Sequence, residues 1–260
     1  MTEKYVKNKL LILAITLVLV SCSSPAASMP KGPDAEWDVV VIGDSTMWYL
    51  GEALASRIEE DVGVKVKLHL WIVGGLSAGE VLLALEIYEE GGLSKLLKDA
   101  EFVVIWANPQ DSVIPEIPMG GDACFGYGGT VESCPPEAYE KFTADLKVIY
   151  ARIFDLRDGQ PTIVRGVDFY NPVVSQWIKQ DKFEACTECW VTLSNATRLA
   201  AEAYNIPFLS RYDAFNGPNH DEDPREKGLI MSDGKHPNEL AGEFTAELLS
   251  KMGYEPVTPP

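Results

Sequence analysis

Strand patterns alternate with helical patterns along most of this chain of 260 residues, and this alternation limits the folds open to it. The first strand is expected over Asp38–Ile42, which is continuously apolar after Asp38. Such runs are typical of parallel strands that are covered on both faces, whereas one-sided sheets alternate apolar and polar residues. The sequence therefore predicts one α/β domain, with a parallel sheet between two layers of helices.

The other elements follow from the same periodicities. Helices are expected over 47–62, 78–89, 93–98, 138–156, 191–204 and 238–252, and further strands over 64–73, 102–106, 162–167 and 207–210. The stretches 108–136, 168–182 and 213–231 are expected to be irregular. Loops as long as the first of these usually carry function or are pinned by cross-links.

The first 22 residues have the pattern of an export signal. Three lysines precede an apolar run over 10–20, which is too short to span a membrane comfortably. The ending Leu19-Val20-Ser21-Cys22 resembles a bacterial lipobox, which implies cleavage before Cys22 and lipidation of its sulfur. The alternative is a plain signal peptide or membrane anchor with an incidental cysteine. We expect a lipoprotein of the bacterial cell envelope, extracytoplasmic and anchored to the membrane by its lipid.

Composition sets the remaining boundaries. Residues 23–36 are rich in Ser, Pro and Ala and are expected to form a flexible tether, the folded domain should cover 37–254, and 255–260 should be a disordered tail. The net charge of −17 repels phosphate backbones and anionic headgroups. We therefore expect no nucleic-acid partner, and attachment to the membrane by the lipid rather than by a basic patch.

Four cysteines remain once Cys22 is set aside, and an even number in an exported chain favours disulfides. Among three connectivities we expect the local one, in which Cys124 pairs with Cys134 and Cys186 pairs with Cys189. One alternative is a zinc site built from all four thiolates, and another is a thioredoxin-like redox role for the Cys-Thr-Glu-Cys segment. We expect neither a metal nor a cofactor.

A candidate nucleophile follows the first strand directly, in Gly43-Asp44-Ser45. Active sites in open parallel sheets lie beyond the carboxyl ends of the strands, so Ser45 is well placed. Gly43 permits a tight turn, and the amides that begin the next helix would point at whatever the hydroxyl attacks. A second interpretation is that Asp44 or Ser45 only caps that helix.

A serine needs a base to take its proton, and Asp233 and His236 supply a candidate pair. Three residues apart on a turn, the carboxylate can orient the imidazole and stabilise its protonated form. The other two histidines are weaker candidates, because His69 lies in a strand pattern and His220 in a polar loop where it should be solvated. Asn238 is expected to cap the last helix.

Gly-Asp-Ser near the mature N-terminus, with Asp-x-x-His-Pro before a terminal helix, resembles the SGNH (GDSL) hydrolase superfamily. The resemblance covers roughly residues 37–253. It implies a flavodoxin-like three-layer α/β/α fold and ester hydrolysis. It also implies that Ser45 is the nucleophile, His236 the general base and Asp233 its orienting partner.

The resemblance further implies an oxyanion hole, in which the amide of Ser45 is one donor. The second family block contributes a glycine amide, and here that segment reads Gly-Leu-Ser-Ala-Gly over 75–79. Strict register places Ala78 at the glycine position, and a shift by one residue gives Gly79.

The third block contributes an asparagine side chain, and here the segment reads Asn-Pro-Gln-Asp over 108–111. Register gives Gln110, whose amide is one methylene longer, and Asn108 is the other candidate. Loss of one oxyanion donor costs on the order of 10²- to 10³-fold in turnover.

Two functions compete on this basis. The first is a serine esterase acting on small-molecule or glycan esters, such as short acyl or O-acetyl esters, with acyl transfer as a variant. The second is an accessory lipoprotein that binds but hydrolyses little. Loop aromatics could then stack on glycans, although ordinary packing explains them better: Phe125, Tyr127, Phe169, Tyr170 and Trp177.

Overall fold

The computed structural model describes residues 28–87, 92–109, 124 and 136–260. A parallel five-stranded sheet has the order β2-β1-β3-β4-β5. The strands are β1 (Glu36–Gly43), β2 (Lys65–Ile72), β3 (Ala100–Ile105), β4 (Ile163–Val167) and β5 (Phe208–Leu209). This is the flavodoxin-like order, and it confirms the predicted fold class.

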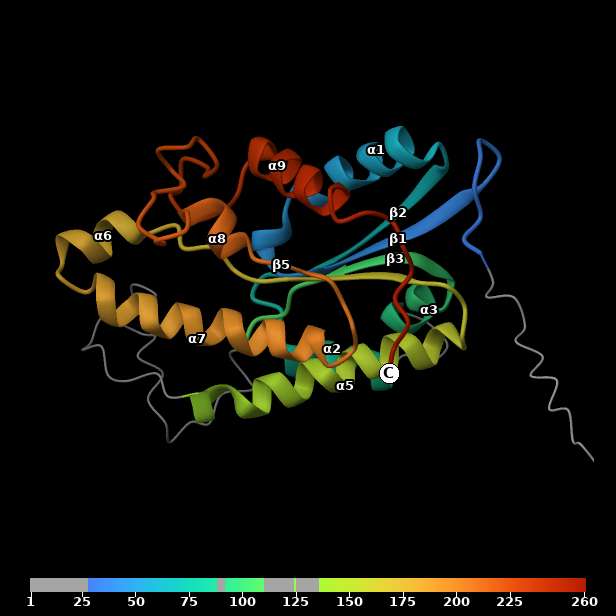
Figure 1. Cartoon of the computed structure of the whole chain (residues 1–260), viewed down its shortest axis with the longest axis horizontal. Helices are drawn as coiled ribbons and strands as arrows, with labels where there is room; N and C mark the ends of the chain where they lie inside the picture. Colours follow the sequence, from blue (N-terminus) through green and yellow to red (C-terminus); the bar gives the residue numbers. More distant parts are fainter. Residues whose placement is uncertain (1–27, 88–91, 110–123, 125–135) are drawn as a thin grey trace, which may run out of the picture.

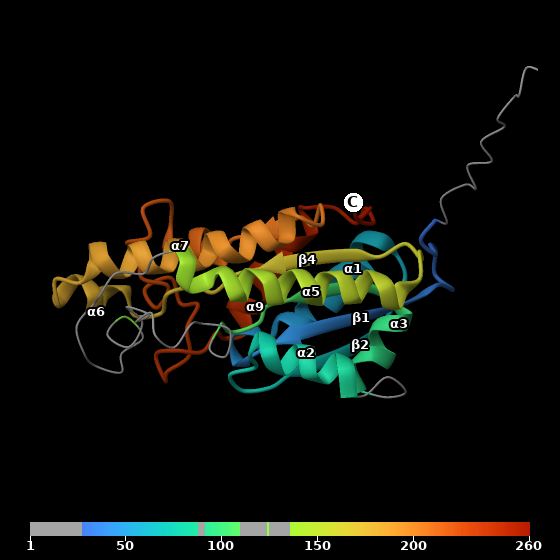
Figure 2. The same cartoon turned by 90° about the horizontal axis from the view of Figure 1, so that it is seen from below.

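Helices cover both faces of the sheet (Figures 1 and 2). One face carries α1 (Leu50–Val62) and α9 (Glu239–Ser250), and the other carries α2 (Ala78–Ile87), α3 (Gly92–Asp99), α5 (Glu140–Arg157) and α7 (Phe183–Glu202). Residues 39–42 of β1 are 0% exposed because both faces above them are covered. The apolar run in the sequence is therefore the centre of the core.

The first predicted helix is divided in two. A single 3-10 turn, η1 (Ser45–Met47), comes first, and α1 begins only at Leu50. Tyr49 separates them with φ +64°, in the left-handed region. Asp44 caps η1 as a helix of its own, which is why the periodic pattern over 47–62 does not form one element.

Two predicted loops contain helices. Residues 168–182 include α6 (Val174–Lys179), and α8 (Arg211–Asn216) lies at the edge of the polar stretch after β5. Helix α7 begins eight residues earlier than predicted, so that Cys186 and Cys189 are helical and buried. Both α6 and α8 lie beyond the carboxyl ends of the strands (Figure 1).

The predicted disulfide pairing is wrong. Cys124 bonds to Cys186, 62 residues away, and the indole of Trp177 donates to the Cys124 carbonyl at 2.8 Å. Cβ atoms three residues apart on a helix are about 5–6 Å apart, whereas a disulfide needs about 3.5–4.5 Å, so Cys186 and Cys189 are poorly placed to bridge. Cys189 is also disulfide-bonded, and Cys134 lies outside the described residues. Because Cys124 and Cys186 form a disulfide, neither is a thiolate that could bind zinc.

Both terminal segments lie against the domain more closely than their composition suggests. Met29, in the expected tether, is 6% exposed, and the Trp37 indole donates to the Pro30 carbonyl at 2.8 Å. In the expected disordered tail, the Val257 amide donates to the Thr162 carbonyl at 2.9 Å. Apolar side chains in both segments pack on the core, which the Pro-rich composition does not reveal.

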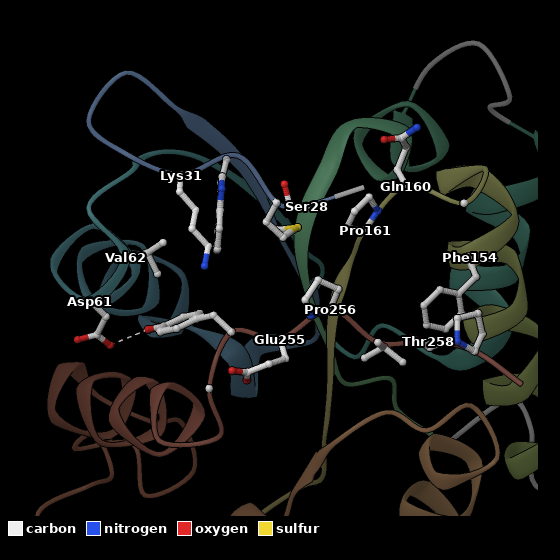
Figure 3. Close-up of a pocket in the computed structure, with 17 residues that line it drawn as sticks. Ser28, Lys31, Asp61, Val62, Phe154, Gln160, Pro161, Glu255, Pro256 and Thr258 are labelled. Atoms are coloured by element: carbon white, nitrogen blue, oxygen red, sulfur yellow. Dashed lines mark hydrogen bonds between the residues drawn. The ribbon is translucent and has the colours of Figure 1, made fainter. Parts of the chain in front are cut away.

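A cavity of about 1060 Å³ lies between these segments (Figure 3). Lys31 lines it from the N-terminal segment, Glu255 and Pro256 from the C-terminal one, and Pro161 from the turn before β4. The cavity is therefore at the amino ends of the strands, opposite the edge where Gly43 ends β1.

Cys22 and the export-signal segment lie outside the described residues. Among the helices that the structure describes, none combines the length and the apolar character needed to cross a membrane.

Gly242 tests how tightly α9 packs on the turn after β1. A Cβ at this position would lie 2.5 Å from the Tyr49 carbonyl oxygen, a backbone atom that cannot move without shifting the turn. Gly242→Ala is expected to lower the free energy of unfolding in urea by about 1–3 kcal/mol, more than the helix propensity gained. Gly74→Ala is the control, because nothing lies within 4 Å of its added Cβ. Equal stability of the two variants would contradict the close packing.

Candidate active site

The turn after β1 assigns different tasks to Asp44 and Ser45. Asp44 is 3% exposed, and its Oδ1 accepts from the Thr46 amide at 2.9 Å and from the Thr46 hydroxyl at 2.6 Å. Its Oδ2 accepts from the Trp106 indole at 3.3 Å. Asp44 is thus the cap of η1, and the Ser45 hydroxyl is left for another partner.

Gly43 lets this turn fold back on the end of the sheet. A Cβ there would lie 2.3 Å from Met47 Cγ and 3.3 Å from the Trp106 carbonyl oxygen. Met47 is fully buried, so it has little room to give way. A residue with a side chain at position 43 would therefore displace the turn that carries Ser45.

The Ser45 hydroxyl lies within hydrogen-bonding distance of His236, 191 residues later in the chain. Ser45 Oγ is 3.0 Å from His236 Nε2, and His236 Nδ1 is 2.6 Å from Asp233 Oδ2. With the carboxylate accepting from Nδ1–H, Nε2 is the acceptor for the serine hydroxyl. This is the geometry in which an imidazole can take the serine proton.

Backbone amides hold the Asp233 carboxylate in its charged form. Its Oδ1 accepts from the Lys235 amide at 2.9 Å and from the His236 amide at 3.1 Å. These bonds, the Lys235 amide first and then the His236 side chain, lower the pKa of Asp233 to about 2. Asp233 is therefore a permanent carboxylate at neutral pH although its side chain is 44% exposed.

The loop around His236 is fixed on both sides. The Met231 amide donates to the His236 carbonyl at 2.8 Å, and Ile230 pairs with Pro237 in an antiparallel bridge. Asn238 Oδ1 then accepts from the Ala241 amide at 3.1 Å, which is the helix cap predicted for α9.

Trp48 lies over the His236 imidazole, and sequence reasoning missed it. Its ring is stacked on His236 with centroids 4.6 Å apart, and the side chain remains exposed to solvent. An aromatic residue just after Gly-Asp-Ser was the available signal, but only the fold brings it to a histidine so distant in the sequence.

Ala78 is already engaged by a backbone bond. Its amide donates to the Asn108 carbonyl at 2.9 Å, and the Asn108 amide donates to the Leu76 carbonyl at 2.8 Å. Ser77 and Asn108 thereby form a parallel bridge that continues the sheet beyond its strands. This contact does not fit the oxyanion role predicted for the Ala78 amide.

The same segment forms a capping box at the start of α2. The Ser77 amide donates to Glu80 Oε2 at 2.9 Å, and the Glu80 amide donates to Ser77 Oγ at 3.1 Å. Ser77-x-x-Glu80 was the signal for it in the sequence. The cap fixes the first turn of α2, in which Gly79 is the second residue.

The other predicted oxyanion residues are placed as follows. Among the contacts of the described residues, none engages the amide of Gly79 or that of Ser45. Asn108 follows β3 and lies beside Ser77, whereas Gln110 lies outside the described residues.

The two other histidines have partners away from Ser45. His69 lies on β2 with its Nε2 2.5 Å from Asp38 Oδ1. His220 was expected to be solvated, but its side chain is only 17% exposed. Its ring stacks on that of Tyr212 with centroids 3.9 Å apart, and its Nε2 lies 2.7 Å from Asp213 Oδ1. Only the folded loop creates these contacts.

The loop aromatics that the structure describes are packed inside. Tyr170 and Trp177 are buried, and Phe169 lies between the rings of Trp106 and Trp190. Tyr170 and Trp177 are therefore unavailable as a glycan-stacking platform, whereas Phe169 is only partly buried. Phe125 and Tyr127 lie outside the described residues. Within the described ranges, no group of three His, Cys, Asp or Glu side chains could hold a metal ion.

Solved structures share the fold. The lipase Lip_vut3 from a goat rumen metagenome is 19% identical, with a TM-score of 0.58 over 85% of this chain and 98% of that one. The acetyl xylan esterase AlAXEase is 15% identical, with a TM-score of 0.51 over 83% of this chain and 98% of that one. No family model and no curated protein matches the sequence. The chain therefore has an SGNH/GDSL-like fold.

The lowered pKa of Asp233 predicts a pH-dependent contribution to stability. A carboxyl whose folded-state pKa lies below 3.8 stabilises the folded state above that value, and the contribution disappears as the pH falls through about 2. We expect wild type to exceed Asp233→Asn in stability by a constant amount at mildly acidic pH, and the difference to shrink between about pH 4 and pH 2. Urea unfolding at each pH measures it, and a difference that grows on acidification would contradict the assignment.

Proposed function

We propose that this protein is a serine esterase that hydrolyses carboxylic esters through a Ser45–His236–Asp233 triad and an acyl-enzyme. The observation that carries the proposal is the continuous chain of contacts from Ser45 Oγ through His236 to Asp233. The folds shared with a lipase and an acetyl xylan esterase support it.

The reaction follows from these contacts. Ser45 Oγ attacks the ester carbonyl carbon while His236 Nε2 takes the hydroxyl proton, and Asp233 stabilises the imidazolium that forms. His236 then gives this proton to the departing alcohol oxygen, which leaves the acyl group on Ser45. Water attacks the acyl carbonyl and loses a proton to His236, and the acid departs as Ser45 Oγ recovers that proton.

The oxyanion formed in each step needs donors. The amide of Ser45 begins η1, and the amide of Gly79 lies in the capped first turn of α2. We assign these two as the backbone donors, because the Ala78 amide is bound to Asn108. The side chain of Asn108 or Gln110 completes the set.

The substrate class is a short ester on a small molecule or a glycan. The triad lies at the surface, with Ser45 partly exposed and Trp48 open to solvent beside it. Such a site accepts a short acyl group, for example an O-acetyl group carried by a larger alcohol.

The occupied Ala78 amide favours one second candidate, an accessory lipoprotein that keeps the fold and hydrolyses weakly. With one oxyanion donor missing, turnover would fall on the order of 10²- to 10³-fold. Turnover numbers on short esters separate the two candidates. Acyl transfer in place of hydrolysis would appear as ester exchange with an added alcohol.

We also propose that the protein is anchored at the bacterial cell envelope by a lipid on Cys22, on the extracytoplasmic side. The lysine-led apolar segment and the residues before Cys22 support this placement. Disulfide bonding of Cys124 and Cys186 fits an oxidising compartment.

A fluorophosphonate probe tests the nucleophile. The purified domain should be labelled at Ser45, because the probe needs a serine activated by a base, and Ser45→Ala and His236→Ala should both lose the label. Turnover of p-nitrophenyl acetate should fall at least about 10⁴-fold in either variant. Thr192→Ala, which removes an exposed hydroxyl on α7, is the control and should keep the label. Wild type without Ser45-dependent labelling and without turnover would refute the esterase.

The anchor has a separate test. Intact mass of protein extracted from membranes should correspond to a chain that begins at Cys22 and carries acyl groups. A Cys22→Ser variant should lose membrane attachment. An unmodified Cys22 in membrane-extracted protein would refute the lipid anchor and leave the esterase proposal untouched.

A further inference from the structure

Two buried side chains lie between the turn that carries Ser45 and the loop that carries His236. Tyr170 is 0% exposed and follows β4, and Arg211 is 2% exposed and begins α8. Each hydrogen-bonds to backbone in one of the two catalytic segments, and neither side chain contacts the reacting atoms.

Tyr170 holds the histidine loop. Its hydroxyl donates to the Lys235 carbonyl at 2.9 Å. The same peptide group carries the His236 amide, which donates to Asp233 Oδ1 at 3.1 Å. A hydrogen bond at the carbonyl polarises the peptide and strengthens its N–H as a donor. The Tyr170 hydroxyl therefore both fixes the loop and supports the carboxylate that orients the imidazole.

Arg211 holds the serine turn. Its Nη1 donates to the Thr46 carbonyl at 2.8 Å, and its Nη2 lies 3.3 Å from the Thr46 hydroxyl. Thr46 follows Ser45 within η1, and its hydroxyl also donates to Asp44. The guanidinium thus contacts the carbonyl and the hydroxyl of Thr46, the residue that follows the proposed nucleophile.

Asp168 directs Arg211 toward this turn. Its carboxylate accepts from the amides of Arg211 and Tyr212 at the start of α8, and from the hydroxyls of Ser194 and Ser210. Its carbonyl accepts from Arg211 Nε at 2.6 Å. Burial raises the pKa of the Asp168 carboxyl, and the charge of the nearby Arg211 guanidinium acts in the opposite direction.

The two holding groups also contact each other. Arg211 Cζ lies 5.6 Å from the centroid of the Tyr170 ring, in cation–π geometry, and Phe215 stacks on the same ring at 4.8 Å. A movement of one group therefore moves the other. The serine turn and the histidine loop are connected through these two side chains, which we call the Tyr170–Arg211 clasp.

We propose that the Tyr170–Arg211 clasp positions the triad, holding the serine turn and the histidine loop at the separation at which Ser45 Oγ bonds to His236 Nε2. Its catalytic effect rests on the proposed esterase function. Tyr170 and Arg211 are positioning residues, since they act only through Lys235 and Thr46.

Tyr170→Phe is the primary test, because it removes only the hydroxyl and keeps both ring contacts. We expect kcat on p-nitrophenyl acetate to fall about 10- to 10²-fold while KM stays within about twofold, since misplacement of reacting groups lowers the rate and not binding. Tyr150→Phe is the matched control, because it removes a hydroxyl from a tyrosine that is 1% exposed on α5, on the other face of the sheet. It should leave kcat unchanged.

A second readout does not depend on turnover. The chain has three histidines, so NMR of protein labelled with ¹⁵N-histidine can follow each imidazole. Tyr170→Phe should shift the His236 ring signals and weaken the low-field proton of the Nδ1–Asp233 bond, with His69 and His220 unmoved. Unchanged His236 signals would overturn the proposal, whether or not wild type hydrolyses esters. If wild type shows no turnover but Tyr170→Phe still shifts the His236 signals, the esterase proposal is refuted and the positioning proposal stands.

Arg211→Lys tests the other half. Lysine keeps the charge beside Asp168 and loses the fork that reaches both Thr46 atoms. If the two side chains act together, the shifts of the His236 ring signals caused by Arg211→Lys and by Tyr170→Phe should be non-additive in the double variant. Strictly additive effects would contradict their joint action.

Discussion

Strand β1 lies between two parallel neighbours and is buried on both faces, and the position of the candidate active site follows from that constraint. Because all five strands run the same way, their carboxyl ends reach one edge of the sheet. The serine turn, the Ser77–Asn108 bridge and Asp168 all follow strand ends at that edge. The histidine loop lies at the same edge and leads into α9, which packs beside α1 on one face of the sheet (Figure 1).

The site combines an exposed chemical layer with a buried supporting layer. Asp233 and His236 are partly open to solvent, and backbone amides from their own loop keep the carboxylate charged. Beneath them, Asp168 and Arg211 are almost completely enclosed. Burial raises the pKa of Asp168 to about 6, while the Ser194 hydroxyl and the Tyr212 amide lower it. Asp233 and His236 are thus accessible from solvent, and the proposed role of the buried residues beneath them is to fix their position.

Local patterns in the sequence were sufficient for much of the fold. The apolar run of β1, the helical spacing of Leu50, Leu54 and Ile58, and the Asn238 cap depend on short-range physics and were predicted. The parallel sheet followed from the alternation of elements, and the flavodoxin-like order from the family resemblance. The break at Tyr49 was not predicted, because no local pattern marks a left-handed tyrosine, and its contact with Gly242 of α9 exists only in the fold. The early start of α7 was missed for lack of a capping side chain at Lys182.

Residues that act through tertiary contacts were beyond sequence reasoning. The Cys124–Cys186 bond joins segments 62 residues apart, so spacing alone favoured the wrong partner. Tyr170 was noted only as a loop aromatic, and Arg211 not at all, since no local pattern marks a buried arginine that binds a distant backbone carbonyl. The Ala78 amide is occupied for a similar reason, because its partner is the carbonyl of Asn108 after β3.

In the proposed mechanism Ser45 carries the acyl group during turnover, and this intermediate can be trapped. Wild type mixed with excess p-nitrophenyl acetate and quenched in acid within the burst phase should gain the mass of one acetyl group, and peptide mapping should place it on Ser45. Turnover with no acyl-enzyme, or with the acyl group on another residue, would rule out Ser45 as the nucleophile.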